Sequence, residues 1–414
     1  MNETEILVKR IAEGIQERKG RNIVVADLTD TDNTVCKYFV ICEGNTPTQV
    51  AAIADSISDY VRINTGAKPT AIEGLRNARW VAMDYGDVLV HIFVPEDRTF
   101  YNLENLFDIY DDPETHDEEF LPDGVKQWNE IKYQKKLTNM ERVLFDIAAI
   151  QKDYPIVIGV SEIENRTVLE DLVSQPKLKG ANYRICHYDS PDARGVDCAF
   201  LYRSDVFKLE GSDNIKLVVD ELPNFRTRDL VVMWGTIEGE PFYFLVSHWP
   251  SRLGGKEASQ FKRDACAKQI KEIKDSLIAQ NPATKVIVMG DFNDDATDAS
   301  ISKVMGAKGK EKELQHGDFF NPFNQMLRAG LGTLAYQDVW NLFDHICVTE
   351  NLVNAEEGKL RIIKGKKFYG NIFTRPYMLQ QEGQYKGYPL RTFVTNNFQN
   401  GFSDHFPVYI YIGK

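Results

Sequence analysis

The chain has 414 residues, 43% hydrophobic and 11% aromatic, enough apolar side chain for a sizeable core, which excludes disordered and collagen-like proteins. At roughly 150 residues per domain, this length suggests about two or three domains. Lysine and arginine total 49 against 61 acids, so the net charge of −12 leaves the chain without the overall positive charge that coats nucleic acid. No apolar run approaches the roughly 18 residues that span a bilayer, and the acidic start does not resemble a secretory signal. We therefore expect a cytoplasmic protein with no membrane span.

The cysteines are scattered and form no Cys-x-x-Cys pair. This spacing favours buried free thiols over a disulfide framework or a metal site. The six residues are Cys36, Cys42, Cys186, Cys198, Cys266 and Cys347.

The first hundred residues alternate helical and strand-like patterns. Leu7, Ile11 and Ile15 share one helix face, and a second helix is predicted from the Thr46-Pro47-Thr48-Gln49 start signal onward. Strands are predicted at 22–27 and 38–42, and a hairpin at 80–84 and 88–94. The pattern predicts a compact α/β module of ordinary domain size.

Residues 108–123 are rich in acids and loop formers, which is typical of a flexible linker. Beyond them, many apolar strand-like runs alternate with few amphipathic stretches, which predicts packed sheets with helices outside. The predicted strands are 156–160, 198–202, 230–234, 242–246, 286–289, 346–348 and 408–412, and the helical stretches are 139–151 and 257–279.

Polar residues fall at the ends of these strands and can converge on one edge of the sheets. Carboxylates with an asparagine and histidines suit a hard divalent cation and the acid and base groups of phosphate ester hydrolysis. Each residue alone has an ordinary alternative, such as a solvated strand end, a packed histidine or an Asx turn. The residues concerned are Glu162, His248, Asp291, Asn293, Asp344, Asp404 and His405.

Five motifs in order make the chain from about Arg98 onward resemble the endonuclease/exonuclease/phosphatase family. They are residues 101–108 around Asn102, 161–165 around Glu162, 247–252 around His248, 290–294 around Asp291, and 403–405. The resemblance implies a four-layer α/β sandwich that hydrolyses phosphoesters with Mg²⁺ or Mn²⁺. It also implies that residues 108–128 are a long loop of the enzyme rather than a linker.

Carried over position by position, the resemblance implies a role for each motif residue. Glu162 and Asp404 resemble metal ligands, and Asn102 the asparagine that orients the phosphate or metal. Asp291 and Asn293 look like the pair that activates and positions the attacking water. His405, oriented by Asp344, resembles the histidine that stabilises charge on phosphoryl oxygens, and His248 occupies a second catalytic or phosphate-contacting position. Ser161 and Ser247 depart from the usual pattern without removing a ligand.

The first 107 residues or so resemble the ribosomal silencing factor family (RsfS, Iojap-like). The resemblance rests on the stretches 37–45, 73–75, 84–87 and 90–95. It implies a module that binds a ribosomal protein of the large subunit and represses translation. The candidate contact residues are Lys37, Tyr38, Trp80, Asp84 and Tyr85.

Two features of this module bear on its function. Lys37 stands where that family commonly has an acid, a charge reversal that bears on affinity for the ribosome. A metal cluster of Asp84, Asp87 and His91 is conceivable, but a hairpin with a packed histidine is favoured.

The two resemblances overlap between Arg98 and Phe107, so one segment has to serve both parts. We divide the chain into domains 1–98 and 99–414 and expect the hydrolase to take residues 100–103. Recombination at a shared sequence or an assembly error would each produce such a junction.

Two functions remain open for the chain. One is a ribosome-binding repressor joined to a metal-dependent hydrolase, and the other is a repressor with a catalytically poor passenger. The substrate stays open among DNA, RNA, nucleotides, inositol phosphates and phospholipid headgroups.

Overall fold

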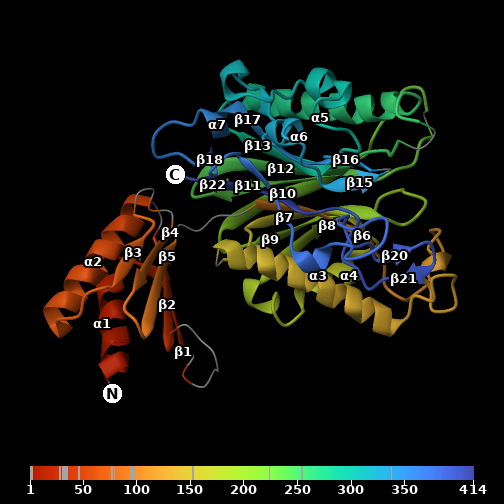
Figure 1. Cartoon of the computed structure of the whole chain (residues 1–414). Coiled ribbons are helices and arrows are strands. Elements are labelled where there is room, and N and C mark those ends of the chain that lie inside the picture. The colour runs from red at the N-terminus through yellow and green to blue at the C-terminus, as the bar shows by residue number, and fades with distance from the viewer. Residues whose placement is uncertain are drawn as a thin grey trace. The chain divides into compact units, whose positions relative to one another are not determined.

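A computed structural model describes residues 3–27, 29, 36–44, 47–75, 78, 80–93, 98–151, 153–222, 224–252, 255–336 and 338–414. The chain forms two compact units (Figure 1). The first is built mainly from residues 1–96 and the second from residues 97–150 and 154–412.

The first unit is a mixed sheet of order β1-β2-β5-β4-β3 with two helices. Strands β2 and β5 are parallel and the other neighbours are antiparallel. Ile11 and Ile15, from the predicted helix face, are fully buried against Ile53 and Val90. The elements are α1 (Glu3–Glu17), β1 (Arg21–Asp27), β2 (Tyr38–Glu43), α2 (Pro47–Thr65), β3 (Ala71–Glu73), β4 (Trp80–Asp84) and β5 (Val88–Phe93). The predicted α/β module is confirmed, although the expected helix-capping Thr46 lies outside the described residues.

The second unit contains two large sheets that pack face to face. One has the order β10-β11-β12-β13-β17-β14, and the other β18-β22-β6-β7-β9-β8 with β19 paired to β22. Their inner faces meet so closely that a Cβ added at Gly159 would lie 2.6 Å from the Met289 sulfur. This close approach explains why a glycine occupies the middle of a buried strand.

Helices cover the outer face of each sheet, with α3 and α4 on one side and α5 on the other (Figure 1). Leu137 and Leu144 of α3 pack on β6 and β7, while Ala267 and Ile270 of α5 pack on β12 and β13. The four layers confirm the predicted α/β sandwich.

The bounds of the second unit's elements follow in chain order. The helices are α3 (Glu130–Gln151), α4 (Arg166–Val173), α5 (Gln260–Gln280), α6 (Asn324–Arg328) and α7 (Glu350–Val353), with short turns η1 (Glu118–Phe120), η2 (Lys179–Ala181), η3 (Ser300–Val304), η4 (Glu311–Glu313) and η5 (Pro376–Met378). The strands are β6 (Arg98–Leu106), β7 (Val157–Ile163), β8 (Tyr183–His187), β9 (Asp197–Arg203), β10 (Phe207–Ile215), β11 (Leu230–Ile237), β12 (Glu240–His248), β13 (Lys285–Asp291), β14 (Phe319–Phe320), β15 (Leu334–Tyr336), β16 (Val339–Asn341), β17 (Asp344–Thr349), β18 (Arg361–Ile363), β19 (Gly370–Ile372), β20 (Phe393–Val394), β21 (Asn397–Phe398) and β22 (Val408–Gly413).

Strand β6, the segment that both resemblances include, lies inside the sandwich. It pairs in parallel with β7, with Asn102 opposite Ser161, and antiparallel with β22, with Phe100 opposite Val408. The expectation that residues 100–103 belong to the hydrolase sheet is confirmed.

The acidic segment after β6 is not a linker. Phe120 and Trp128 are buried in the core beside Phe107, and the Trp128 indole donates a hydrogen bond to the Phe107 carbonyl. The prediction of a linker was wrong because it rested on the many acidic residues of this segment. Its few aromatic residues pack into the core and fix the segment to the sandwich.

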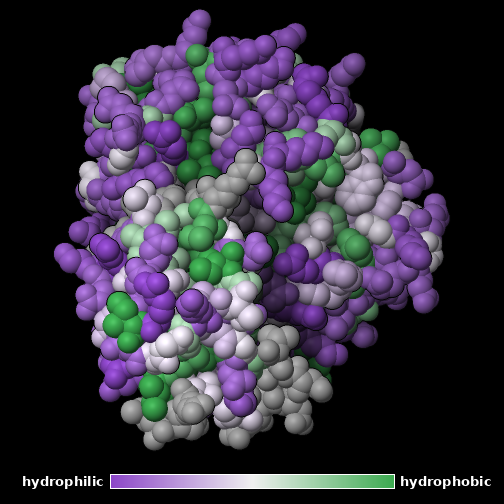
Figure 2. All heavy atoms as spheres, turned by 60° about the vertical axis from the view of Figure 1, so that its left-hand side comes forward, coloured by the Kyte–Doolittle hydropathy of each residue, from purple (hydrophilic) through white to green (hydrophobic). Residues whose placement is uncertain are grey.

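The surface view in Figure 2 is mostly hydrophilic, with hydrophobic side chains in small groups. Among the described residues, no helix combines the length and apolarity needed to cross a bilayer. The six cysteines are free and buried, as predicted.

The face-to-face core should dominate the stability of the second unit. Ile287 of β13 is fully buried between the sheets, and Ile131 of α3 is 67% exposed. We predict that Ile287→Ala lowers the free energy of unfolding by about 2–5 kcal/mol because it leaves a cavity. The matched Ile131→Ala should change it by no more than about 0.5 kcal/mol. Urea unfolding of both variants measures this, and equal effects would contradict the described packing.

Candidate active site

Three neighbouring strand ends bring acidic and imidazole groups together. In the first sheet His248 lies opposite Asp291 across the parallel β12–β13 pair, and Asp291 lies opposite Asp344 across β13–β17. Strand pairing alone therefore places these three residues at one edge.

The second sheet delivers its residues through irregular backbone. Pairing of β6 with β7 shifts register after Asn102, and β7 with β9 shifts around Glu162. Glu104, Asn105 and Glu162 adopt left-handed φ values of 52°, 53° and 57°. Such conformations cost about 1–3 kcal/mol each and are often found at functional sites. Here they bring the Glu162 carboxylate to the Asn105 amide, which donates to it at 3.1 Å.

Asp291 is the centre of the cluster. The Asn102 side-chain amide donates to its Oδ2 at 3.3 Å, and His248 Nε2 and His405 Nε2 lie 3.6 and 3.8 Å from the same atom. The backbone amide of Asn293 donates to Asp291 Oδ1 at 2.9 Å. Burial raises the pKa of Asp291 to about 7, although the nearby His405 charge opposes the shift.

His405 and Asp344 form a buried pair. His405 Nδ1 lies 2.8 Å from Asp344 Oδ2, which leaves Nε2 directed toward Asp291. Burial alone would lower the pKa of His405, but the Asp344 and Asp291 carboxylates outweigh it and hold the pKa well above its usual value. A protonated imidazole at this place can donate a hydrogen bond from Nε2.

Glu162 and Asp404 form a pair of like charges. Burial raises the pKa of Glu162, and the Asp404 charge raises it further. Burial would also raise the pKa of Asp404, but His405 and Arg391 outweigh it and hold the pKa below its usual value. Two partly buried carboxylates near each other are stabilised by a divalent cation, and oxygen ligands suit Mg²⁺ or Mn²⁺.

A second observation fits a cation here. Oδ1 of the buried Asp344 has no hydrogen-bond partner among the described residues, and Asp291, Asp344 and His405 place ligand atoms within 4.8 Å of one another. The donor set therefore fits a divalent cation. The predicted ligands Glu162 and Asp404 do not belong to this group of three, and their role as ligands stays a prediction.

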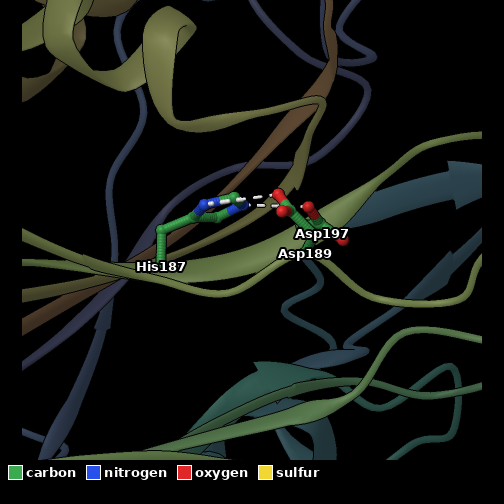
Figure 3. A group of neighbouring side chains, drawn as sticks. All are labelled: His187, Asp189 and Asp197. Carbon is green, nitrogen blue, oxygen red and sulfur yellow. Dashed lines mark hydrogen bonds and ion pairs between the residues drawn. The ribbon is translucent and has the colours of Figure 1, made fainter. Parts of the chain in front are cut away.

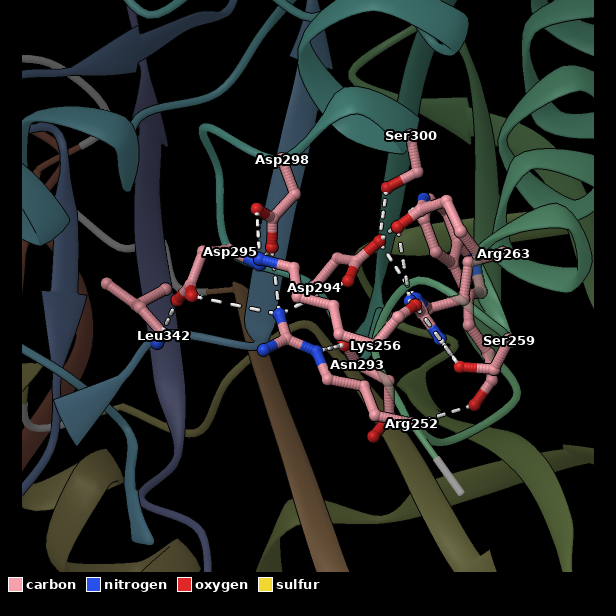
Figure 4. Close-up of polar contacts among 12 residues, drawn as sticks. Arg252, Lys256, Ser259, Arg263, Asn293, Asp294, Asp295, Asp298, Ser300 and Leu342 are labelled. Carbon is pink, nitrogen blue, oxygen red and sulfur yellow. Dashed lines mark hydrogen bonds and ion pairs between the residues drawn. The ribbon is translucent and has the colours of Figure 1, made fainter. Parts of the chain in front are cut away.

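Asn293 lies in the site, but its side chain has another contact. Its Nδ2 donates to the Trp249 carbonyl at 2.9 Å, and its φ is 50°. In Figure 4, Arg252 donates to the Asn293 carbonyl at 2.8 Å and lies 2.8 Å from Asp298. The geometry supports a role in shaping the loop after β13, and the predicted water-positioning role stays a prediction.

Arg252 is the last residue of the motif 247–252, but the sequence did not predict a role for it. It ties the loop after β12 to the loop after β13, and Arg263 of α5 reinforces the second loop through a 2.9 Å ion pair with Asp294 (Figure 4). Both partners in that pair are fully buried. Arginines thus hold the loops that follow His248 and Asp291. The positions of these arginines in the sequence do not indicate that role.

Two further arginines near His248 were missed. Burial lowers the pKa of His248 far below its usual value, and the positive charges of Arg228 and Arg194 add to this effect. Arg228 is buried and donates to Asp192 at 3.1 Å and to the Trp249 carbonyl at 2.9 Å. The environment therefore disfavours the charged form of His248 and favours the charged form of His405.

Lys136 of α3 was also missed, because a lysine in an amphipathic helix usually faces solvent. Its ammonium is fully buried, donates to the Phe402 carbonyl at 2.7 Å and lies 3.9 Å from Glu104. Glu104 in turn accepts hydrogen bonds from the Thr392 amide and hydroxyl. These bonds fix the segment that carries Asp404 and His405 to strand β6.

Outside this site, the His187 ring points toward the neighbouring carboxylates of Asp189 and Asp197 (Figure 3). Its Nε2 is 2.9 Å from Asp197, whose other oxygen accepts from the Ser190 amide, while Asp189 is 3.9 Å from Nδ1 and almost fully exposed. These contacts join β8 to β9 and explain the group as a structural feature of that hairpin.

The predicted ribosome-contacting residues divide by exposure. Lys37 is half exposed and lies 2.8 Å from Asp87, whereas Tyr38 is only 8% exposed and belongs to the core. Asp84 and Tyr85 are partly exposed, and the Trp80 side chain lies outside the described residues. Tyr38 is thus placed as a core residue, and the contact role of all five stays a prediction.

The first unit also contains Asp84, Asp87 and His91, the three residues considered as a metal cluster. Asp84 ends β4 and Asp87 lies in the turn before β5, while His91 is buried within β5 with its ring 5.5 Å from that of Phe39. The group does not appear among the His, Cys, Asp and Glu clusters of the described residues that could hold a metal.

Comparison with known proteins decides the family of the larger part. The model of the endonuclease/exonuclease/phosphatase family matches residues 98–414. The chain belongs to this family. Among solved structures, Bacteroides thetaiotaomicron mannosyl-6-phosphatase is 17% identical with a TM-score of 0.47, covering 77% of this chain and 100% of that one. A D. rerio TDP2 complexed with single-strand DNA product is 15% identical with a TM-score of 0.46, covering 77% and 99%.

The amino-terminal part belongs to a second family. The model for the ribosomal silencing factor during starvation matches residues 1–141. The RsfS of Bacillus subtilis is 40% identical over 107 residues, which are 26% of this chain and 88% of that protein. The RsfS of Zymomonas mobilis is 34% identical over 108 residues, 26% of this chain and 80% of that protein. Both resemblances inferred from the sequence are confirmed, and the two matches overlap across β6 and part of α3.

A buried acid beside the site offers a test of its electrostatics. Glu164 accepts a 2.6 Å hydrogen bond from the Asp108 amide, and burial raises its pKa to about 8 despite that bond. Because the folded-state pKa exceeds the unfolded value, the stability from protonated Glu164 is full below about pH 4.5 and is lost as pH rises toward about 8. We predict that wild type loses stability relative to Glu164→Gln between about pH 5 and pH 8.

The measurement is urea unfolding at both pH values, with the exposed Glu382→Gln as the matched control. The control should follow the wild type at both values. A constant difference between wild type and Glu164→Gln would contradict the described burial.

Proposed function

We propose that residues 99–414 hydrolyse phosphoesters with Mg²⁺ or Mn²⁺. The observation that carries this proposal is the placement of Asn102, His248 and His405 within 3.8 Å of one buried Asp291 oxygen. A carboxylate surrounded by imidazole and amide groups can accept a proton beside groups that stabilise an oxyanion. A purely structural role in the core would not require these polar groups to meet at the same strand ends.

The side chains divide the chemistry as follows. Asp291 accepts the proton of the attacking water, and Asn293 shapes the loop beside it. His405, oriented by Asp344 at 2.8 Å, donates from Nε2 to the phosphoryl oxygens. His248, whose Nε2 lies 3.9 Å from Glu162 and 3.6 Å from Asp291, donates a second hydrogen bond to the phosphate. Preorganised donors of this kind stabilise the transition state because they need no rearrangement.

Glu162 and Asp404, with Asn102 beside them, would hold the cation. When bound, the cation supplies positive charge that neutralises the phosphate oxygens. Without a cation, the like charges of Glu162 and Asp404 disfavour each other, and this repulsion adds to burial in raising the pKa of Glu162.

We predict that the purified chain hydrolyses bis-p-nitrophenyl phosphate with Mg²⁺ or Mn²⁺ and loses this activity in EDTA. Asp291→Asn and His405→Ala should each lower turnover by about a hundredfold or more, since they remove a proton acceptor and an oxyanion donor. The matched controls Asp189→Asn and His316→Ala alter exposed groups with 93% and 68% side-chain exposure and should retain activity.

The alternative is a repressor with a catalytically poor passenger domain. Full activity in both site variants would refute the assigned residues. If a folded chain shows no metal-dependent activity on diester or monoester probes, the result would favour the passenger domain.

We also propose that residues 1–98 bind the large ribosomal subunit, through a ribosomal protein, and repress translation in the cytoplasm. The 40% identity to an RsfS supports this partner, and the partly exposed hairpin residues Asp84 and Tyr85 offer a surface. Charge opposes a contact made chiefly with ribosomal RNA, because the whole chain carries −12.

We predict that the full chain co-sediments with large subunits and that its binding depends only shallowly on salt. Lys37→Glu should strengthen binding, because it restores the acid that is common at this position in the family. Lys9→Glu makes the same charge change on the exposed face of α1 and should leave binding unchanged. Absence of co-sedimentation in wild type and Lys37→Glu alike would refute the ribosome-binding proposal.

A further inference from the structure

A hollow of about 730 Å³ opens beside the candidate active site. Asp404 and Arg391 line it at one end, and Tyr336, Tyr385 and Tyr388 line it farther out. The volume lies within the range of pockets that hold small molecules and is far larger than one phosphate group needs. The site thus has room for the group that carries the phosphate.

Aromatic side chains in and beside this hollow are unusually exposed. Tyr336 and Tyr385, which line it, are 67% and 52% exposed. Trp340, which packs edge-on against the lining residue Tyr388, is 37% exposed. Large aromatic residues at the surface of a folded chain usually serve recognition, because burying them would stabilise the fold. Their concentration in one place beside the catalytic groups indicates a binding surface.

A row of ring contacts links this surface to the catalytic histidine. Phe406, which follows His405, stacks on Trp340 at 6.1 Å, and Trp340 meets Tyr388 edge-on at 5.8 Å. Tyr388 lies 5.5 Å from Tyr385. The outer rings therefore have a continuous packed connection to the segment that carries His405.

Hydrogen bonds fix the two loops that carry the rings. The Phe406 amide donates to the Thr333 carbonyl at 2.8 Å, which ties the β15–β16 hairpin to the catalytic segment. The Tyr388 hydroxyl donates to Asp338 at 2.5 Å and joins the hairpin to the loop after η5. A preorganised surface of this kind binds without first having to order its loops.

We propose that this aromatic surface, comprising Tyr336, Trp340, Tyr385 and Tyr388, binds the base of a nucleotide whose phosphate lies in the active site. The proposal rests on the proposed hydrolase function and names its substrate class. Stacking on tyrosine and tryptophan suits any base, since each has an aromatic face. Arg391, 54% exposed in its side chain, faces the same hollow and offers one cation for the phosphate.

The charges favour a single nucleotide unit over a long strand. Along the hollow, Arg391 is the one cation among the described lining residues, and it is already paired with Asp404 at 2.5 Å. A groove that follows a nucleic acid backbone needs a series of cations. Gln380 and Gln384 also line the hollow and bring amide groups suited to base edges.

The first experiment compares two substrates with the same leaving group, thymidine 5′-(p-nitrophenyl phosphate) and methyl p-nitrophenyl phosphate. We expect kcat/KM for the nucleoside ester to exceed that for the methyl ester by roughly tenfold or more, the magnitude of stacking on one base. Equal values would overturn the nucleotide subsite and leave the hydrolase proposal intact. Absence of hydrolysis for both would refute the proposed function, and the subsite would then be decided by binding alone.

The binding measurement does not depend on activity. AMP and ribose 5-phosphate share the phosphate and pentose, so calorimetric titration in EDTA, which stops metal-dependent hydrolysis, isolates the base. We expect AMP to bind roughly tenfold or more tightly than ribose 5-phosphate. Equal affinities, or tighter binding of the sugar phosphate, would overturn the proposal.

Variants locate the effect. Tyr336→Leu and Tyr385→Leu should each reduce the preference for AMP severalfold, whereas Tyr336→Phe should retain it, because the ring rather than the hydroxyl stacks. Tyr110→Leu, which changes a tyrosine that is 71% exposed and outside the hollow, is the matched control and should keep the wild-type preference. An unchanged preference in both leucine variants would overturn the assignment of these rings.

Discussion

The site depends on one electrostatic constraint, which is that Asp291 is buried among other ionisable groups. A buried carboxylate that lacks partners costs several kcal/mol or shifts its pKa until it is neutral. The fold supplies an asparagine amide, a backbone amide and two imidazoles around it, and its pKa still rises to about 7. The pKa values of the two histidines shift in opposite directions. Asp344 lies 2.8 Å from His405 and raises its pKa, whereas burial, with the charges of Arg228 and Arg194, lowers that of His248.

The same constraint explains the irregular backbone and the buried ionic contacts around the site. Three left-handed residues, Glu104, Asn105 and Glu162, are retained although each costs about 1–3 kcal/mol. The buried Lys136–Glu104 pair and the Arg263–Asp294 pair hold the loops that carry the catalytic groups. Because a buried ion pair contributes little net stability, their value here lies in fixing positions.

Much of the fold followed from the sequence because strand ends are marked by polarity. The placement of Asp291, His248 and Asp344 followed from apolar runs that end in a polar residue, and strand pairing brings those ends together. Asn102 needed the family motif, whereas Glu162 was predicted from its place at a strand end, although nothing in the local pattern predicts its positive φ. Charge composition wrongly suggested a linker at residues 108–123, because Phe120 and Trp128 decide its packing.

Long-range contacts between surface-type residues stayed hidden from the sequence. Lys136, Arg228 and Arg263 are buried, although such residues are usually exposed. The exposed tyrosines beside the site come from separate loops, so their proximity appears only in three dimensions. Residues that act through backbone hydrogen bonds, such as Thr333, carry no sequence signal of that role.

Manganese binding tests the central account most directly, because it asks whether the buried carboxylates hold a cation at all. Calorimetric titration of the wild-type chain should show a Mn²⁺ site whose affinity falls by tenfold or more in Glu162→Gln. Glu164→Gln makes the same substitution at a buried glutamate two positions away and should retain the wild-type affinity. Equal Mn²⁺ affinity in wild type and Glu162→Gln would contradict the assignment of the site.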